Sequence, residues 1–412
     1  MEEAIKVKDE VYWVGVLNPD LKKFDIVLDT PWGTTYNSYL IKAEKIALID
    51  TVWSRFTDQF LKKIKSLIDL KDIAYVVLNH LEPDHSSSLP ALLKEAKNAT
   101  VVFSKTAEHF YKNIFHLENQ QILKVGDGDS LNLGNKTLKF ISAPFLHWPD
   151  TMFTYLEEEK ILFPCDCFGC HFSPESTEKL FNDLAGDFSQ AFQYYFSHII
   201  RPYKEFVLPA VKKMTPMLHR GHPDPNQVSG EGSQIEIIAP SHGPILRKDP
   251  WKYVQQYVEW STPPKRERKR ILILYVSAWG MTKRIAESIE QGAKSNDVEV
   301  NLYDASEVDL EKMRDEIELA DGIIVGSPTI CGDLVKPIWD ILAIMSSVKV
   351  KGKKAAAFGS YGWSGEAVKL IEERLKTLKM KVVESGLRFC FMPTEEDLKK
   401  SFEFGKNFAE QL

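Results

Sequence analysis

Long apolar runs are absent from this sequence, and no stretch approaches the roughly 20 residues that a helix needs to cross a bilayer. The amino terminus also lacks the apolar core of a secretory signal. Excess positive charge is missing too, because the 412 residues carry a formal net charge of −6 with both signs interspersed. The sequence therefore predicts a soluble cytoplasmic protein with neither nucleic acid nor a membrane as partner.

Cysteine is scarce, with only five residues in the chain. They are Cys165, Cys167, Cys170, Cys331 and Cys390. An odd number with three members close together is not typical of a disulfide framework, so a reducing compartment is expected. The Cys-x-Cys-x-x-Cys spacing could indicate a thiolate metal site, but we interpret these three cysteines as small buried residues.

A proline-rich and charged segment divides the chain. Residues 263–270 read Pro-Pro-Lys-Arg-Glu-Arg-Lys-Arg. The two prolines end the preceding helix, and the charges favour a solvated linker. We therefore expect an N-terminal domain over residues 1–262, a linker over 263–270 and a C-terminal domain over 271–412.

The C-terminal part alternates apolar segments of strand length with amphipathic segments of helical spacing. The predicted strands are Ile271–Val276, Val298–Tyr303, Gly322–Gly326, Lys354–Gly359 and Lys381–Ser385. The predicted helices are Thr282–Gln291, Val308–Ala320, Lys336–Ser347, Glu366–Leu378 and Glu395–Gln411. Such alternation predicts an α/β domain whose parallel sheet has helices on both faces.

The N-terminal part reads differently, as short strands in succession with few helices. The predicted strands are Val11–Val16, Thr35–Lys42, Lys45–Asp50, Ala74–Leu78, Thr100–Phe103, Ser130–Leu133, Lys136–Ile141, Thr151–Leu156, Ile161–Pro164 and Ile235–Ala239. Helices are predicted at Phe56–Ile68 and Leu89–Glu95. This pattern favours an α+β sandwich of two sheets with helices outside.

The first functional signal is the segment Asn-His-Leu-Glu-Pro-Asp-His at residues 79–85, directly after a predicted strand. In an extended backbone His80, Glu82 and Asp84 would share one face, and the turn after Pro83 can bring His85 round. A lone histidine or aspartate is more often structural. Four potential ligands in six residues indicate metal binding.

Three single residues occur in similar settings further along the chain. His147, Asp166 and His242 each follow a predicted strand closely, with proline or glycine nearby. Each alone is a weak signal. Together with residues 80–85 they predict a site assembled from loops at one sheet edge.

This arrangement resembles the metallo-β-lactamase superfamily, whose first motif, H-x-H-x-D-H, is followed by a distant His, a bridging Asp and a last His. Glu82 stands where the hydrolases have their second His. A carboxylate in that place makes the site harder and more anionic, which suits iron or manganese better than zinc.

A second signal lies between the first strand and first helix of the C-terminal domain. The free N–H groups of that helix and the hydroxyls of Ser277 and Thr282 would form an anion cradle. With Gly280 as its only glycine, the loop is not the dinucleotide fingerprint GxGxxG. It resembles the phosphate loop of flavodoxins.

Two further loops follow the third and fourth predicted strands, which line the crevice in a flavodoxin-like strand order. The second offers Tyr361 and Trp363 for stacking on a flavin ring. Together the three loops predict an FMN site. Its expected contacts are Ser277, Ala278, Trp279, Gly280, Met281, Thr282, Ser327, Pro328, Thr329, Ser360, Tyr361, Gly362, Trp363 and Gly365.

The H-x-E-x-D-H motif followed by a flavodoxin-like domain resembles the flavodiiron proteins over essentially the whole chain. The resemblance implies an αββα sandwich followed by a doubly wound, five-stranded parallel sheet. It assigns His80, Glu82 and His147 to one iron, Asp84, His85 and His242 to the other, and Asp166 as the bridge between them. It also places His171 near the pocket, with a supporting or proton-donating role.

Members of this family reduce O2 to water, NO to N2O, or both, with electrons that pass through FMN to the two iron ions. No Cys-x-x-Cys pair follows the last predicted helix before Leu412, so we expect a separate rubredoxin or similar carrier as the electron donor. The resemblance also implies a head-to-tail homodimer or a dimer of dimers.

Two alternatives from other classes remain open on the sequence. One is a dinuclear zinc hydrolase of the metallo-β-lactamase type with an accessory flavodoxin-like domain, against which Glu82 argues. The other is an electron carrier in which only FMN is active, against which the full ligand set argues. The sequence does not rank O2 against NO as the substrate.

Overall fold

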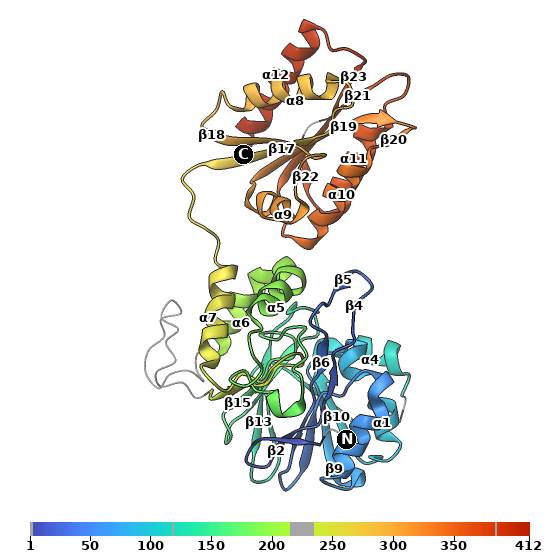
Figure 1. Cartoon of the computed structure of the whole chain (residues 1–412), viewed down its shortest axis with the longest axis vertical. Coiled ribbons are helices and arrows are strands. Elements are labelled where there is room, and N and C mark those ends of the chain that lie inside the picture. Colours follow the sequence, from blue (N-terminus) through green and yellow to red (C-terminus); the bar gives the residue numbers. More distant parts are fainter. Residues whose placement is uncertain (1–2, 118, 215–234, 384) are drawn as a thin grey trace. The chain divides into compact units, whose positions relative to one another are not determined.

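The computed structural model describes residues 3–117, 119–214, 235–383 and 385–412. The chain forms two compact units, Met1–Pro263 and Pro264–Leu412 (Figure 1). Among the described residues, no helix combines the length and the apolar character that a membrane span requires. Each unit is built around its own sheets and cores.

The first unit contains two main sheets. The larger has the strand order β1 (Ile5–Lys8), β2 (Val11–Trp13), β7 (Tyr39–Ile41), β8 (Ile46–Ile49), β9 (Ile73–Leu78), β10 (Thr100–Ser104) and β11 (Ile122–Val125). The smaller has the order β12 (Ser130–Asn132), β13 (Thr137–Ser142), β14 (Met152–Leu156), β15 (Ile161–Phe163) and β16 (Ile237–Ile238). Two short hairpin pairs stand beside them: β3 (Val16–Asn18) with β6 (Thr34–Tyr36), and β4 (Lys23–Phe24) with β5 (Leu28–Asp29).

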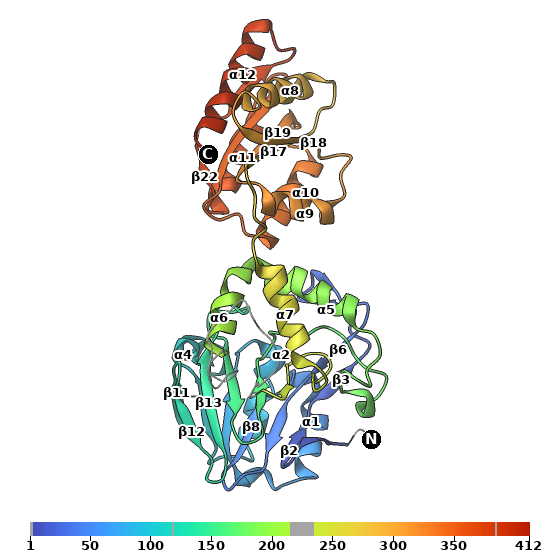
Figure 2. The same ribbon diagram turned by 90° about the vertical axis from the view of Figure 1, so that its left-hand side faces the viewer.

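The two sheets pack face to face, with Trp13 and Tyr39 of the larger sheet in one core with Phe140 and Phe163 of the smaller. Helices cover the outer face of the larger sheet: α1 (Thr57–Lys65), α3 (Leu89–Leu93) and α4 (Glu108–Phe115). Others cover the smaller sheet: α5 (Ser189–Tyr195), α6 (Val207–Met214) and α7 (Pro250–Ser261) (Figure 2). The predicted αββα sandwich is confirmed.

Short helical turns connect these elements. They are η1 (Ser54–Phe56), η2 (Leu70–Asp72), α2 (Pro83–Ser86), η3 (Lys105–Ala107), η4 (Thr177–Lys179), the π-helix η5 (Phe196–Ile200) and η6 (Arg201–Phe206). The sequence predicted a helix that ends before Pro263, which is α7, but it did not predict α4, α5 and α6, nor β1, β4, β5 and β11. The missed helices bury their apolar residues against cores built from distant segments, which a local pattern does not reveal.

One predicted strand, Thr35–Lys42, is in fact two strands, β6 and β7, separated at Asn37. The Asn37 N–H donates to the Ser241 carbonyl at 2.8 Å, and its side-chain amide donates to the Pro240 carbonyl at 2.8 Å. These bonds take Asn37 out of the sheet ladder, because its polar groups serve the loop that carries His242. The break therefore belongs to the construction of the functional site.

The second unit is a doubly wound sheet in the flavodoxin strand order. Its parallel strands run in the order β18 (Val298–Asp304), β17 (Lys269–Tyr275), β19 (Gly322–Ile330), β21 (Lys354–Tyr361) and β22 (Lys381–Val382). On one face lie α8 (Met281–Ala293) and α12 (Glu395–Glu410). On the other lie α9 (Leu310–Leu319), α10 (Lys336–Ile344), η8 (Met345–Ser347) and α11 (Glu366–Thr377).

The central strands of this sheet run further than predicted. β19 continues to Ile330 because its end pairs with the short antiparallel strand β20 (Asp333–Leu334). The predicted fifth strand is replaced by two, β22 and β23 (Leu387–Cys390), which both pair with β21. Within the predicted range, Glu384 lies outside the described residues.

Candidate metal centre and flavin site

The loops that carry the predicted ligands meet around Asp50, which follows β8. Its buried carboxylate accepts the Asn79 N–H at 2.7 Å and the Ser241 hydroxyl at 3.3 Å. It therefore joins the loop before His80 to the loop before His242. Burial raises the pKa of Asp50 to about 6.

The segment from His80 to His85 is not extended throughout, which corrects the expectation from the sequence. Glu82 has an extended backbone, and Pro83 begins the short helix α2 that contains Asp84 and His85. Proline favours the first position of a helix because its φ is already suitable and no N–H is needed there. The helical turn separates the four ligand-type residues into two pairs.

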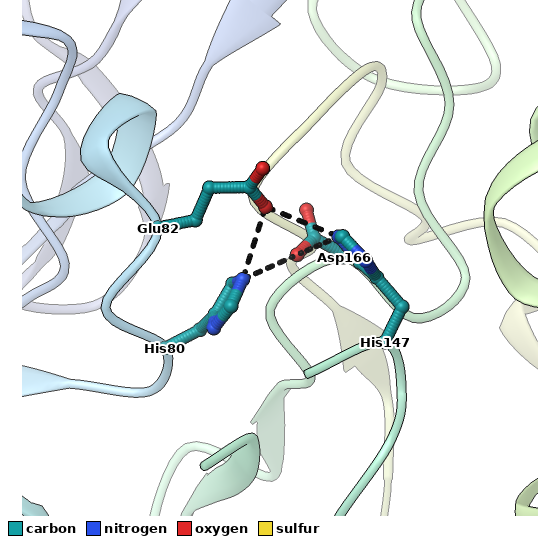
Figure 3. A group of neighbouring side chains, drawn as sticks. All are labelled: His80, Glu82, His147 and Asp166. Carbon is teal, nitrogen blue, oxygen red and sulfur yellow. Dashed lines mark hydrogen bonds and ion pairs between the residues drawn. The ribbon is translucent and has the colours of Figure 1, made fainter. Parts of the chain in front are cut away.

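Those pairs become the two groups of the site. His80, Glu82, His147 and Asp166 place one ligand atom each within 4.8 Å of one another (Figure 3). Asp84, His85 and His242 form the second group by the same measure. In the first group, Glu82 Oε2 lies 3.1 Å from Nε2 of both histidines.

Asp166 lies between the groups, with one carboxylate oxygen toward each. Its Oδ1 is 3.0 Å from His85 Nε2 and 3.5 Å from His242 Nε2. Its Oδ2 is 3.7 Å from His80 Nε2 and 3.6 Å from His147 Nε2. This is the geometry that a carboxylate needs to bridge two metal ions.

The donor set fits two cations. Within the described part of the chain, neither oxygen of the buried Asp84 carboxylate has a hydrogen bond, although His242 Nε2 lies 3.1 Å from Oδ2. A buried carboxylate without a donor is costly unless a cation is bound. Histidine nitrogen with carboxylate oxygen, and no required thiolate, suits iron or manganese, the two metals that the donor set favoured in the sequence.

The histidines and carboxylates of the two groups shift one another's pKa values. Burial disfavours charge on His85, but the carboxylates of Asp84 and Asp166 outweigh it and raise the pKa of His85 to about 10. Against the same burial, Asp150 and Glu82 raise the pKa of His80 well above its ordinary value. Burial alone would also raise the pKa of Glu82, yet hydrogen bonds from His147 and His80 lower it.

Metal binding near neutral pH is therefore expected to release protons, because His80 and His85 have raised pKa values and a ligand imidazole must be neutral. Calorimetric metal titrations in two buffers of different ionisation enthalpy would count them. The raised pKa of His85 stabilises the metal-free fold below its ordinary pKa of 6.5, and this stabilisation is lost as pH rises toward 10. Metal binding without proton release would contradict this arrangement.

His171 lies beside the second group, as expected. Its Nδ1 is 2.9 Å from the Thr34 hydroxyl, and its ring centroid is 4.8 Å from that of His242. The ring is buried, and among the described residues its Nε2 has no hydrogen-bond partner. Burial lowers the pKa of His171 well below its ordinary value.

Tyr195 is a residue of the site that the sequence analysis missed. Its hydroxyl donates to Asp166 Oδ1 at 3.1 Å from within the buried end of α5. The π-helix η5 begins at the next residue, Phe196, and π-helical turns are frequent at functional sites. No sequence motif near Tyr195 indicates its role, because its partner Asp166 lies in a distant loop.

A pocket with a volume of about 200 Å³ opens beside the two groups. Its lining includes Lys23, Phe24 and Asp25 from the β4–β5 hairpin, and Glu82 and Asp84 from the ligand loop. Burial and the neighbouring carboxylates of Glu82 and Asp84 raise the pKa of Asp25 to about 6. The sequence analysis did not identify this hairpin as part of the site.

The clustered cysteines Cys165, Cys167 and Cys170 are buried, as interpreted from the sequence. Burial raises the pKa of all three thiols. Cys165 nevertheless lies closer to the centre than expected, because its sulfur is within 4.8 Å of ligand atoms of His85 and Asp166. The other two cysteines belong to the core beneath the smaller sheet.

The predicted FMN loops all lie at the carboxyl end of the second unit's sheet. Residues 276–280 lead from β17 into α8, whose first residue is Met281, and Gly280 has a φ of 82° that favours glycine. The Ser277 hydroxyl is buried and has no partner among the residues that the structure describes, which suits a cradle that receives a phosphate. Trp279 is 84% exposed and Trp363 is 87% exposed, so both are available for stacking.

Side chains of the predicted contacts on the third strand make hydrogen bonds within the protein. Ser327 and Pro328 lie inside β19, and the Ser327 hydroxyl donates to the Pro328 carbonyl at 2.8 Å. The Thr329 hydroxyl accepts the Ala367 N–H at 3.3 Å. The Ser327 hydroxyl is therefore occupied by the fold, while the Thr329 hydroxyl keeps its own proton to donate.

The fourth-strand residues lie at the end of β21 and in the loop behind it. The Ser360 hydroxyl is 2.8 Å from that of Thr282, which links the fourth strand to the phosphate loop. Tyr361 ends β21, and a Cβ at Gly365 would lie 3.1 Å from its ring. Gly362 and Trp363 follow in the loop that precedes α11.

Comparison with known proteins supports both units. The family model described as ODP family beta lactamase matches residues 34–243, and the flavodoxin model matches residues 273–405. The flavo-diiron protein FprA2 of Clostridium acetobutylicum is 41% identical over 99% of this chain and 100% of its own length. The nitric oxide reductase of Moorella thermoacetica is 34% identical over 100% of both chains.

A solved structure agrees with these relatives. The rubredoxin oxygen:oxidoreductase of Desulfovibrio gigas matches with a TM-score of 0.70 at 28% identity, over 99% of this chain and 98% of that one. The matches span both units in a single alignment, so they concern the combination of domains as well as each domain alone. The chain belongs to the flavodiiron protein family.

Proposed function

We propose that this protein takes electrons from an external donor through FMN to a non-haem di-iron site that reduces O2 to water, NO to N2O, or both. The observation that carries the proposal is Asp166, whose two carboxylate oxygens face two separate groups of ligands. When bound, FMN and two iron ions supply the electron transfer and the reduction. The flavodoxin-like unit in the same chain favours this chemistry over hydrolysis.

The chain's own residues have distinct tasks in this proposal. His80, Glu82 and His147 would hold one iron, and Asp84, His85 and His242 the other, with Asp166 between them. The hydroxyl of Tyr195 orients Asp166 through its hydrogen bond. We assign His171, whose ring centroid lies 4.8 Å from that of His242, a supporting or proton-donating role beside the second group.

Several finer features belong to the same proposal. A relative named nitric oxide reductase and a structural neighbour named rubredoxin oxygen:oxidoreductase support both gases as substrates and rubredoxin as the donor type. We propose a cytoplasmic protein with domains at 1–262 and 271–412, joined by the linker 263–270. We also propose a head-to-tail homodimer or a dimer of dimers.

The decisive experiment starts from metal and flavin analysis of protein isolated from its host. The reduced protein is then mixed with O2 or with NO in an anaerobic stopped-flow instrument. We expect two iron ions and one FMN per chain, and oxidation of the reduced protein by at least one gas over many turnovers. Two zinc ions together with lactam or thioester hydrolysis would instead support the hydrolase.

The proposed head-to-tail dimer predicts complementation between two inactive chains. One chain carries Asp166→Ala and lacks the metal bridge, and the other carries Ser277→Asp and lacks FMN. Co-expressed and purified as a mixture, they should recover about a quarter of the wild-type rate per chain, because half of the randomly paired dimers hold one complete pair of sites. Electron transfer within one chain would leave the mixture inactive.

A further inference from the structure

Asp150 is a buried carboxylate that belongs to neither ligand group. Its Oδ1 accepts a hydrogen bond from Nδ1 of His80 at 3.2 Å, and its Oδ2 accepts the Leu81 N–H at 2.9 Å. The side chains of Asp150 and His80 are both fully buried. The Asp150 carbonyl is also held by the Ser104 hydroxyl at 2.8 Å. Asp150 is therefore fixed behind His80, on the side away from Glu82.

The histidines of the second group are supported differently. Nδ1 of His242 donates to the backbone carbonyl of Thr35 at 2.5 Å. The Thr34 hydroxyl also lies 3.2 Å from this nitrogen. Among the described residues, the buried Nδ1 of His85 has no hydrogen-bond partner. Neither ring of the second group is therefore hydrogen-bonded through Nδ1 to a carboxylate, as the ring of His80 is.

The ligand carboxylates themselves do not distinguish the two groups. Each group has one of its own, Glu82 or Asp84, and Asp166 is shared. Asp50 also interacts electrostatically with histidines of both groups, His85 and His80. The carboxylate behind His80 is therefore the clearest difference in charge between the two metal positions.

A carboxylate that accepts the outer N–H of a ligand imidazole fixes the ring and makes its other nitrogen a stronger donor. We propose that Asp150 makes the position formed by His80, Glu82 and His147 the tighter of the two metal positions. The ion held by Asp84, His85 and His242 then leaves first. This inference rests on the proposed di-metal function and concerns the order of metal binding within it.

The test follows metal release from the reduced, iron-loaded full-length protein under anaerobic conditions in excess ferrous chelator. Wild-type protein should release iron in a fast and a slow phase of equal amplitude. Asp150→Asn, which removes the charge at nearly constant volume, should accelerate the slow phase about 10- to 100-fold and change the fast phase little. Asp150→Glu, which keeps the charge, should stay closer to the wild type.

Asp50→Asn is the matched control. Like Asp150, Asp50 is a buried carboxylate that accepts a backbone N–H from the loop that carries His80, here the N–H of Asn79. Its other hydrogen bonds come from the side chains of Asn79 and Ser241, and none of them involves a ligand ring. The Asp50→Asn variant should have a lower thermal stability, but it should still release iron in separate fast and slow phases. His147→Ala should remove the slow phase and His242→Ala the fast one, which assigns each phase to its position.

A single release phase in the wild type would overturn the inference, and so would an Asp150→Asn variant whose slow phase is unchanged. If Asp150→Asn does not fold, a slow phase in Asp150→Glu as fast as the fast phase would also overturn it. Metal analysis before chelation separates this result from the proposed function. A protein isolated with zinc would contradict the iron chemistry, while release of that zinc would still test the order of binding.

Discussion

Alanine at Asp166 is expected to abolish turnover with both gases and to remove at least half of the bound metal. Each carboxylate oxygen faces a different ligand group, so one substitution takes a ligand from both metal positions. It also leaves the Tyr195 hydroxyl without its buried acceptor. The loss of activity should exceed the roughly 10- to 100-fold effect typical of a residue behind a ligand. Metal analysis and steady-state gas consumption measure both effects.

Asp183→Ala is a suitable control for this change. Asp183 lies in the same unit and pairs with Arg247 at 2.9 Å near the surface. Loss of such a pair costs about 1 kcal/mol or less, and activity should stay near the wild-type level. An Asp166→Ala protein that retained two metal ions and consumed either gas would refute the bridging role.

Aspartate at Ser277 is expected to eliminate FMN and with it all turnover driven by an electron-donor protein. The Ser277 hydroxyl is buried and unpartnered at the entrance to α8, where the free N–H groups of a helix attract an anion. A carboxylate there would occupy the phosphate position and repel the ligand. Flavin absorbance of the purified protein and its iron content give the two readouts, and iron should be unchanged.

The milder variant Ser277→Ala is the control. It removes one hydrogen bond to a charged group, which is worth about 1.5–3 kcal/mol, so FMN should bind roughly 10- to 100-fold more weakly. Iron should again be retained. A Ser277→Asp protein with full flavin content would place the phosphate elsewhere and remove the main support for this loop as its cradle.

The sequence was most informative where a signal is local. The five helices of the second unit were predicted within about three residues of their ends, as α11 shows, because amphipathic spacing repeats within each helix. The residues around Pro83 were harder. An extended strand and a one-turn helix can both present His80, Glu82 and Asp84 to a metal, and only the structure showed that α2 begins at Pro83.

Residues that act through distant partners were not predictable in this way. Tyr195 lies 29 residues from Asp166 and in a helix without a distinguishing pattern. Asp150 lies 70 residues from His80, and in the sequence it is one more aspartate after a proline. Each acquires its role from a hydrogen bond to a residue far away in the sequence: Tyr195 when α5 packs on the smaller sheet, and Asp150 when the two sheets pack together.

The sequence by itself determined the family, the two-part organisation and the identity of the ligand-type residues, because strand ends, helical periodicity and short motifs are properties of neighbouring residues. The tertiary structure decided which histidine faces which carboxylate, which oxygen of Asp166 serves which group, and that the Asp150 carboxylate stands behind His80. These contacts join loops of the two sheets. Their partners are far apart in the sequence and come within hydrogen-bond distance only when the chain folds and closes the long loops between them.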